Sequence, residues 1–193
     1  MRKILKFLYP VMILTAICLV VSLALSATNM ITENKIEKIN GENQKKAMSR
    51  VLKAETYEEM TFNANGKEIT YYVASDSGKI TGYIFITSSN GYGGKVEVMT
   101  AILPDKTVKA VEILDVSSET PGLGQNTAKE SFYGQFAGKS EKLEVVKSNP
   151  GQNEIEAVTG ATITSTAVTK SVNLAIAYGN AIIKTQEGEN SEK

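Results

Sequence analysis

The stretch Ile80-Thr81-Gly82-Tyr83-Ile84-Phe85-Ile86-Thr87-Ser88 alternates two kinds of side chain. The even positions up to Ile86 carry isoleucine or glycine, whereas the odd positions carry threonine, tyrosine or phenylalanine. A repeat of two residues is typical of a β-strand, because successive side chains point to opposite faces of a sheet. The stretch therefore predicts a strand with two different faces.

Turn signals flank this strand and recur along the chain. Asn65-Gly66 predicts a hairpin turn, and Asp76-Ser77-Gly78 and Pro104-Asp105-Lys106 predict two more. The strands expected between and after these turns are residues 68–75, 80–88, 95–103 and 107–116, with a further short strand at 142–147. Hairpin-length connections cannot serve parallel strands, so we expect an antiparallel sheet.

A helical pattern follows near the end of the chain. Apolar or small residues recur there at steps of three and four, at Val168, Val172, Ala175, Ile176, Gly179, Ile182 and Ile183. Such a stripe suits a helix that packs on a sheet. From Gln186 onward the residues are polar, and we expect them to fray. The predicted fold class is α+β, an antiparallel sheet packed against helices.

The N-terminal part predicts a membrane anchor. Residues 7–27 include no charged side chain and are mostly Leu, Ile, Val, Ala and Met. A helix of about 20 apolar residues spans a bilayer core, so this run is long enough. Arg2, Lys3 and Lys6 precede it, and positive flanks stay in the cytoplasm. We expect a single transmembrane helix with the main domain outside the cytoplasm.

Two other interpretations of this segment stay open. A cleaved signal peptide fits the small residues of Ala24-Leu25-Ser26, although the apolar run is longer than a usual signal-peptide core. A lipoprotein signal at Cys18 fits less well, because the bulky Ile17 precedes it and the apolar run continues past it. The retained anchor is the favoured interpretation.

The remaining organisation follows from these patterns. Residues 1–27 are the cytoplasmic flank and anchor, 28–55 a stalk that is part helix and part linker, 56–184 the folded domain and 185–193 a flexible tail. The stalk is interrupted by Gly41, and its apolar residues at helical spacing are Ile31, Ile36, Ile39, Met48, Val51 and Leu52.

The composition excludes several kinds of chemistry. The chain has 193 residues, 21 Lys and Arg against 21 Asp and Glu, one Cys and no His. Without His it cannot build a Ser-His-Asp triad or a His-ligated zinc site by itself. One Cys can neither hold an iron–sulfur cluster nor close an internal disulfide. The neutral balance removes the broad electrostatic attraction that favours nucleic acid.

The stretch Thr159-Gly160-Ala161-Thr162-Ile163-Thr164-Ser165-Thr166 precedes the terminal helix. Small residues let the backbone approach a ligand, and a helix beginning near Thr164 or Ser165 offers unpaired amides to an anion such as phosphate. Ordinary N-capping by Ser or Thr explains the same residues without a ligand. On physical grounds alone, capping is the simpler interpretation.

Two further stretches favour close backbone approach. Ser117-Ser118-Glu119-Thr120-Pro121-Gly122-Leu123-Gly124 follows a predicted strand, and its Pro-Gly pair predicts a tight turn. Gly91-Tyr92-Gly93-Gly94 opens another strand, and Tyr92 offers an apolar face to a flat ring. A plain surface loop and a core or rim tyrosine are the ordinary alternatives.

Taken together and in this order, the motifs resemble a known family. Gly91-Tyr92-Gly93-Gly94 with Val96-Glu97-Val98-Met99, then Glu119-Thr120-Pro121-Gly122-Leu123-Gly124, then Thr159-Gly160-Ala161-Thr162, all behind an anchor, resemble the FMN-binding G subunit of the Rnf ion-translocating electron-transport complex. The C subunit of the sodium-translocating NADH:quinone oxidoreductase is a relative of that family. Two positions depart from its pattern: Glu156 stands where Asp is usual, and Ser117 or Ser118 replaces a His.

The resemblance implies a covalent flavoprotein. Its members bear FMN by a phosphoester on the threonine that matches Thr162, within a motif that includes Thr159, Gly160 and Ala161. A separate flavin transferase moves the FMN from FAD. For the ring we expect a slot made by Glu119, Thr120, Gly122, Leu123 and Tyr92.

The implied role is an electron-carrying subunit, with no catalytic residue or metal site of its own. It would act with the other membrane and redox subunits of a complex that couples electron transfer between ferredoxin and NAD to Na⁺ or H⁺ movement. An independent anchored flavoprotein and a flavin-free anchored binding module are the alternatives.

Overall fold

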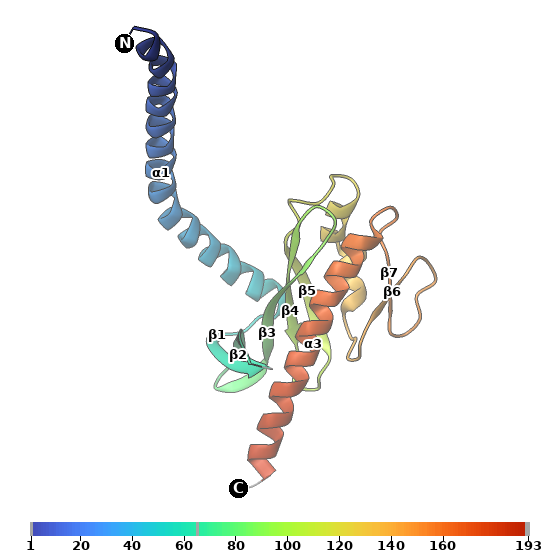
Figure 1. Cartoon of the computed structure of the whole chain (residues 1–193). Helices are drawn as coiled ribbons and strands as arrows, with labels where there is room; N and C mark the ends of the chain where they lie inside the picture. The colour runs from blue at the N-terminus through green and yellow to red at the C-terminus, as the bar shows by residue number, and fades with distance from the viewer. Residues whose placement is uncertain (1, 65, 192–193) are drawn as a thin grey trace. The chain divides into compact units, whose positions relative to one another are not determined.

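The computed structural model describes the backbone of residues 2–64 and 66–191, and the side chains of residues 9–28, 41, 43–64 and 66–187. The chain divides into two compact units, residues 1–45 and 46–193. The helices and strands of Figure 1 are α1 (Arg2–Val51), β1 (Thr56–Ala64), β2 (Lys67–Asp76), β3 (Lys79–Asn90), β4 (Lys95–Ile102), β5 (Val108–Asp115), η1 (Gly124–Ala128), α2 (Glu130–Tyr133), η2 (Gly134–Phe136), β6 (Glu144–Val146), β7 (Glu154–Glu156) and α3 (Thr162–Ser191).

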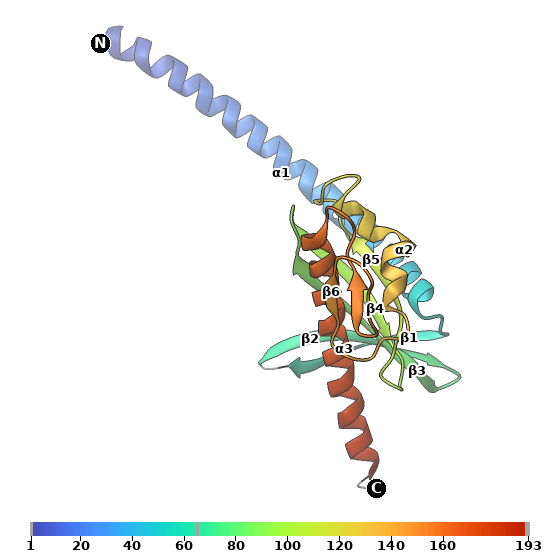
Figure 2. The same cartoon turned by 90° about the vertical axis from the view of Figure 1, so that its right-hand side faces the viewer.

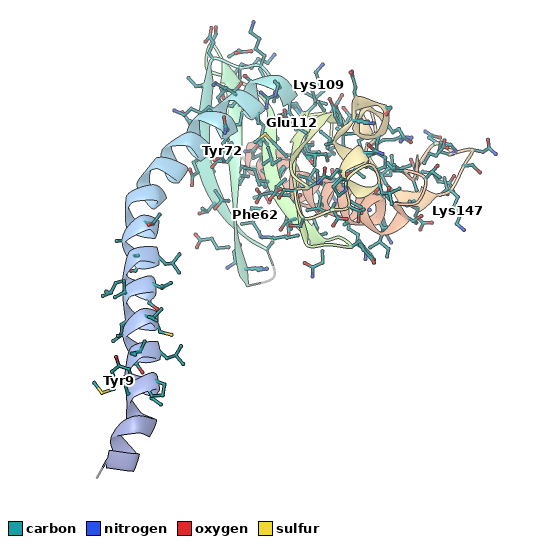
Figure 3. All side chains as sticks on the ribbon, turned by 90° about the horizontal axis from the view of Figure 1, so that it is seen from above. Tyr9, Phe62, Tyr72, Lys109, Glu112 and Lys147 are labelled. Atoms are coloured by element: carbon teal, nitrogen blue, oxygen red, sulfur yellow. The ribbon has the colours of Figure 1, made fainter. Side chains whose placement is uncertain are left out.

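The first unit is the part of α1 up to residue 45. Its segment Tyr9–Thr28 has 20 residues and is long and apolar enough to cross a membrane. All side chains of this segment are exposed, and Figure 3 shows Tyr9 among those that project away from the helix. The side chains of Arg2, Lys3 and Lys6 lie outside the described residues, so the direction of insertion stays a prediction.

The stalk differs from the expectation in two ways. It is helical as far as Val51, and Gly41 does not interrupt the helix. Of its apolar residues, three are buried in the second unit, Met48, Val51 and Leu52, whereas the side chains of Ile31, Ile36 and Ile39 lie outside the described residues. The second unit therefore begins at residue 46, earlier than the boundary expected at residue 56.

The main sheet has five strands in the order β1-β2-β3-β4-β5, and every neighbouring pair is antiparallel. The antiparallel sheet and the α+β class are confirmed. Strand β1 was not among the expected strands, because most of its side chains are exposed and show no alternation. Its hairpin to β2 turns at Gly66, whose φ of 80° suits glycine and whose N–H donates to the side chain of Asn63 at 2.8 Å.

Both faces of this sheet are covered. Helix α3 lies along one face in both Figure 1 and Figure 2, where Tyr83 and Phe85 of β3 join the larger core. The opposite face buries Ile84 against the last turn of α1, which contributes Met48 and Val51. The alternation along β3 thus separates two cores, and Ile84 and Phe85 are both fully buried.

The segment between β5 and α3 departs from the predicted sheet. The short strand expected at residues 142–147 is present as β6, but it pairs in parallel with β7 in a separate two-stranded sheet. A parallel pair is possible here because the loop of residues 147–153 carries the chain back beside so short a strand. Before β6, the short helical turns η1, α2 and η2 were not predicted; α2 and η2 lie beside β5 (Figure 2).

Helix α3 is longer than expected at both ends. It begins at Thr162 rather than near Thr164 or Ser165, and its backbone continues to Ser191, past the expected domain end at residue 184. The predicted apolar stripe is buried throughout, at Val168, Val172, Ala175, Ile176, Gly179, Ile182 and Ile183. Gln186, expected to fray, instead accepts a hydrogen bond from the hydroxyl of Tyr83.

Candidate functional site

Three loops meet at the start of α3 around a cavity of about 470 Å³. They are residues 91–94 between β3 and β4, residues 117–124 after β5, and residues 157–161 before α3. The side chains and backbone that line the cavity belong to Tyr92, Glu119, Thr120, Leu123, Gly124, Gly160, Ala161, Thr162, Ile163 and Thr164. The structure thus brings together seven of the residues predicted from sequence, and adds Gly124, Ile163 and Thr164 to them.

Two predicted site residues do not line this cavity. Thr159 lines a separate cavity of about 660 Å³, together with Lys129, Gln135 and Glu156. Gly122 lies in the turn before η1, where its φ of 76° suits glycine. Each is the chain neighbour of a residue that does line the cavity at the start of α3, Gly160 and Leu123 respectively.

The first amides of α3 lack acceptors within the described part of the chain. The carbonyl of Ala161 accepts the first helical hydrogen bond, from the N–H of Ser165 at 2.9 Å, so Ala161 is the N-cap residue. Its methyl side chain cannot accept a hydrogen bond, and the described residues supply no other acceptor for the N–H groups of Thr162, Ile163 and Thr164. Ordinary Ser or Thr capping therefore does not occur here, and three N–H groups are available to an anion.

The hydroxyl groups of this segment are not equivalent. Thr164 donates to a carboxylate oxygen of Glu119 at 2.5 Å, Ser165 to the Ala161 carbonyl at 2.9 Å and Thr166 to the Thr162 carbonyl at 2.7 Å. Thr164 and Ser165 are also fully buried. By contrast, Thr162 is exposed, and its hydroxyl has no partner among the described residues. Thr162 is thus the hydroxyl in the first turn of α3 that a reagent can reach, and the side chain of Thr120, which also lines the cavity, is exposed as well.

Glu119 joins two of the loops and the start of α3 through one buried carboxylate. Its side chain is 2% exposed. Oε1 accepts the N–H of Gly93 at 3.0 Å, and Oε2 accepts the hydroxyl of Thr164 at 2.5 Å. The ion pairs found among the described residues do not include it. Two neutral donors and the nearby N-terminus of α3 therefore compensate this carboxylate in place of a cation.

Glycine is needed beside Glu119 because the backbone passes it closely. A Cβ atom at Gly124 would lie 2.7 Å from Glu119 Oε2 and 2.8 Å from Thr164 Oγ1. A Cβ at Gly91 would overlap Glu119 Oε1, and one at Gly93 would overlap the carbonyl oxygen of Ser118. These three glycines are therefore explained by steric limits, because a side chain at any of them would collide with Glu119 or with its loop.

The loop of residues 117–124 is held by the side chains that flank it, Asp115 and Gln125. Asp115, at the end of β5, accepts the N–H of Ser117 at 2.8 Å, and this hydrogen bond lowers the pKa of the Asp115 carboxyl. The amide of Gln125 donates to the carbonyl of Glu119 at 3.0 Å and to that of Ser117 at 3.3 Å. The loop that carries Glu119 is therefore ordered before any ligand is bound.

Exposed apolar side chains surround the cavity. Tyr92 is 73% exposed, Ile163 56% and Leu123 43%. Tyr92 and Leu123 come from the first two loops and Ile163 from the first turn of α3, and all three line the cavity. Large apolar side chains in such a position offer a surface to a flat, partly apolar ring.

The site can thus hold a molecule with an anionic end and a flat ring. The free N–H groups at the start of α3 suit a phosphate, the Thr162 hydroxyl is a possible attachment point, and the apolar rim suits the ring. The volume falls in the range of about 300–1,000 Å³ found for small-molecule pockets. FMN has this combination of groups, so the residues present fit it.

Other parts of the described structure are less suited to this chemistry. Another cavity, of about 750 Å³, lies along α3 and is lined by Leu174, Asn173, Lys170 and Lys142 among others, without an exposed hydroxyl at a helix start. Among the described residues, no group of three or more His, Cys, Asp or Glu is placed to hold a metal ion.

Known proteins share this architecture. The family model for the FMN-binding domain matches residues 91–177, which include the three loops and the first half of α3. In fold, the chain resembles the crystal structure of NqrC from Shewanella oneidensis, with a TM-score of 0.52 and 20% identity, covering 61% of this chain and 63% of that one.

Two curated relatives match in sequence. The G subunit of the proton-translocating ferredoxin:NAD(+) oxidoreductase complex of Clostridium ljungdahlii is 45% identical over 113 residues, 58% of this chain and 60% of that protein. The G subunit of the Na(+)-translocating complex of Acetobacterium woodii is 38% identical over 183 residues, 86% of this chain and 87% of that protein. With this identity over most of both chains, the protein belongs to the family of G subunits of ion-translocating ferredoxin:NAD(+) oxidoreductase complexes.

Proposed function

We propose that this chain carries electrons in a complex that couples ferredoxin and NAD oxidoreduction to ion movement, with FMN linked by a phosphoester to Thr162. FMN supplies the redox chemistry, and the protein supplies attachment, orientation and electrostatic environment. The relatives are G subunits of complexes that differ in their ion, so Na⁺ and H⁺ are both compatible with the family.

The observation that carries this proposal is the exposed hydroxyl of Thr162 at the start of α3. It is the exposed first residue of α3, its hydroxyl has no partner among the described residues, and free N–H groups adjoin it. A phosphate esterified there would lie at a helix N-terminus, where both N–H donation and the helix dipole favour negative charge.

Attachment requires another protein. A threonine hydroxyl is a weak nucleophile without a base, and this chain has no His. The carboxylate of Glu119 already accepts two hydrogen bonds. We infer a flavin transferase that supplies the base: the Thr162 oxygen bonds to the phosphorus of the FMN half of FAD, the link between the two phosphates breaks, AMP leaves and the hydroxyl proton passes to that base.

The remaining residues of the cavity would position the ring. Tyr92, Leu123 and Ile163 provide apolar surface, and the buried Glu119 holds their segments together. Because these apolar side chains are exposed, a neighbouring redox protein of the complex could approach a ring held beside them. The anchor Tyr9–Thr28 would keep the domain at the membrane, outside the cytoplasm.

The test is intact-mass analysis of the full chain expressed with and without a flavin transferase. We expect a mass increase of one FMN only with the transferase, and in-gel fluorescence of the same band. Thr162→Ala should remove both signals, whereas Thr166→Ala, a matched loss of a hydroxyl four residues away, should keep both. Flavin retained on the Thr162→Ala protein would contradict the assignment.

A second measurement tests the complex. Affinity purification from native membranes should recover the flavin-bearing chain with membrane subunits that have several spans. Recovery of the flavinylated chain alone would instead identify an independent anchored flavoprotein, and an unmodified chain from native membranes would indicate a flavin-free binding module.

A further inference from the structure

We propose that the carboxylate of Glu119 lowers the midpoint potential of a flavin held at Thr162, acting as a buried negative charge in the wall of the same cavity. This inference rests on the proposed function above. It assigns Glu119 a role that acts through its negative charge, which hydrogen bonds to both carboxylate oxygens hold in place.

The first step of the argument is that Glu119 cannot turn toward a ligand. Gly93 and Thr164 each donate to one of its oxygens, and Gly91 and Gly124 leave no space for a larger residue beside it. Moving the carboxylate would break both hydrogen bonds at a site where the side chain is 2% exposed. Glu119 is therefore a positioning residue with a fixed charge.

The second step concerns the charge itself. The ion pairs in the described part of the chain leave Glu119 out, and its two hydrogen-bond donors are neutral. Charges act over longer distances in a buried, weakly screened environment than in water. Because Glu119 and Thr162 line one cavity, a ring system anchored at Thr162 lies within the range of this charge.

The third step gives the sign of the effect. Each electron that a donor protein gives up adds one negative charge to the ring, and no bond between the protein and the flavin changes. A nearby carboxylate opposes that added charge, so electron uptake becomes less favourable and the midpoint potential falls. A low potential suits a carrier that passes its electrons on to the next acceptor.

The experiment is a redox titration of the flavinylated full chain with Glu119→Gln, which keeps the shape and removes the charge. We expect the equilibrium constant for electron uptake to increase at least tenfold. For a one-electron step this is a rise in the midpoint potential of about 59 mV. Glu130→Gln removes an exposed carboxylate at the start of α2, away from the cavity, and should leave the potential unchanged.

Thr164→Val provides the opposite test. It keeps the charge of Glu119 but removes one of its two donors, so the potential should fall. A rise with Glu119→Gln and a fall with Thr164→Val support the proposal; an unchanged potential in Glu119→Gln overturns it. If Glu119→Gln does not fold, Thr164→Val decides, since a fall supports the proposal and no shift overturns it.

The failure of this inference can be distinguished from failure of the proposed function. Intact mass is measured first on each variant, so a missing FMN on the wild-type chain refutes the attachment at Thr162 before any titration. An FMN that is present, with a potential that does not respond to Glu119, refutes only the electrostatic role. Thermal unfolding of each variant in the Thr162→Ala background measures any purely structural effect without flavin.

Discussion

Arg50 and Glu112 form a bidentate ion pair between the last turn of α1 and β5. Arg50 Nε lies 2.9 Å from one Glu112 carboxylate oxygen and 3.0 Å from the other, and its second nitrogen contacts the same carboxylate. The hydrogen bonds to Glu112 raise the pKa of Arg50. Figure 3 labels Glu112 on the sheet. This pair borders the small core in which Met48 and Val51 are buried.

The buried contacts of this region should matter more than the ion pair. Met48→Ala removes a 3% exposed side chain from the smaller core and should lower the free energy of unfolding by about 2–5 kcal/mol. Arg50→Ala breaks a pair whose arginine side chain is 60% exposed, and should cost less than about 1 kcal/mol. Urea unfolding of the full chain in detergent measures both; a larger effect for Arg50→Ala would show that the helix is held mainly by charge.

Gly124→Ala should destabilise the loop around Glu119. The added Cβ would lie within 2.8 Å of both Glu119 Oε2 and Thr164 Oγ1, so the hydrogen bond between them has to shift or break. We expect a loss of about 1–3 kcal/mol in thermal or urea unfolding. The matched control is Gly134→Ala, whose φ is −63° and whose Cβ would meet only one atom, at 3.9 Å.

The control should be neutral or stabilising by up to about 1 kcal/mol, because alanine restricts the unfolded chain. Equal losses for the two variants would argue against a special steric role for Gly124.

Alkaline pH should weaken the larger core. Burial raises the pKa of Tyr71 and of Tyr83, and the negative charge on Tyr71 raises the pKa of Tyr83 further, against the lowering effect of the hydrogen bond to Gln186. Below the ordinary tyrosine pKa of about 10, both folded and unfolded chains keep these protons, and stability is complete. Between that value and the raised pKa, only the unfolded chain releases them, so the free energy of unfolding falls as pH rises.

Urea unfolding over a series of alkaline buffers measures this slope. Tyr71→Phe should make it shallower, because one of the two shifted groups is removed. The same slope in the wild type and in Tyr71→Phe would show that other groups control alkaline unfolding.

Thr159→Ala should slow flavin attachment without preventing it. Thr159 is exposed and lines the neighbouring cavity with Lys129 and Glu156, away from the Thr162 hydroxyl. Losing one hydrogen bond to the transferase would reduce the rate of mass gain by about twofold to tenfold under limiting transferase. With excess transferase the reaction should reach completion. Complete absence of FMN under those conditions would mean that Thr159 is needed for the chemistry itself.

The sheet was largely predictable from sequence because turn signals separate its strands and because residues 80–88 alternate two kinds of side chain. Strand β1 was not, since Glu58 and Glu59 and their neighbours face solvent on both sides and leave no periodic signal. The parallel pairing of β6 with β7 was not predictable, because it depends on the course of the loop between them and each strand has only three residues. Helix α3 was expected to start later because Ser and Thr are preferred N-caps, whereas Ala161 holds that position.

The site was predictable as a set of motifs but not as a set of contacts. Glu119 and Thr164 are 45 residues apart, and no local pattern predicts that one carboxylate bonds to both Thr164 and Gly93. Had α3 been predicted to begin at Thr162, Thr164 would have been placed inside its first turn, beside the loops of the site. The burial of Thr164 and Ser165, next to the exposed Thr162, likewise depends on tertiary packing.

Thr162 is the first residue of a helix of 30 residues whose apolar stripe runs through the larger core. A group esterified to Thr162 would therefore have a fixed attachment point, and only the rotatable bonds between the threonine oxygen and the ring could change the position of the ring within the domain. A larger change in the distance to a donor or acceptor would require movement of the whole domain or of the partner protein.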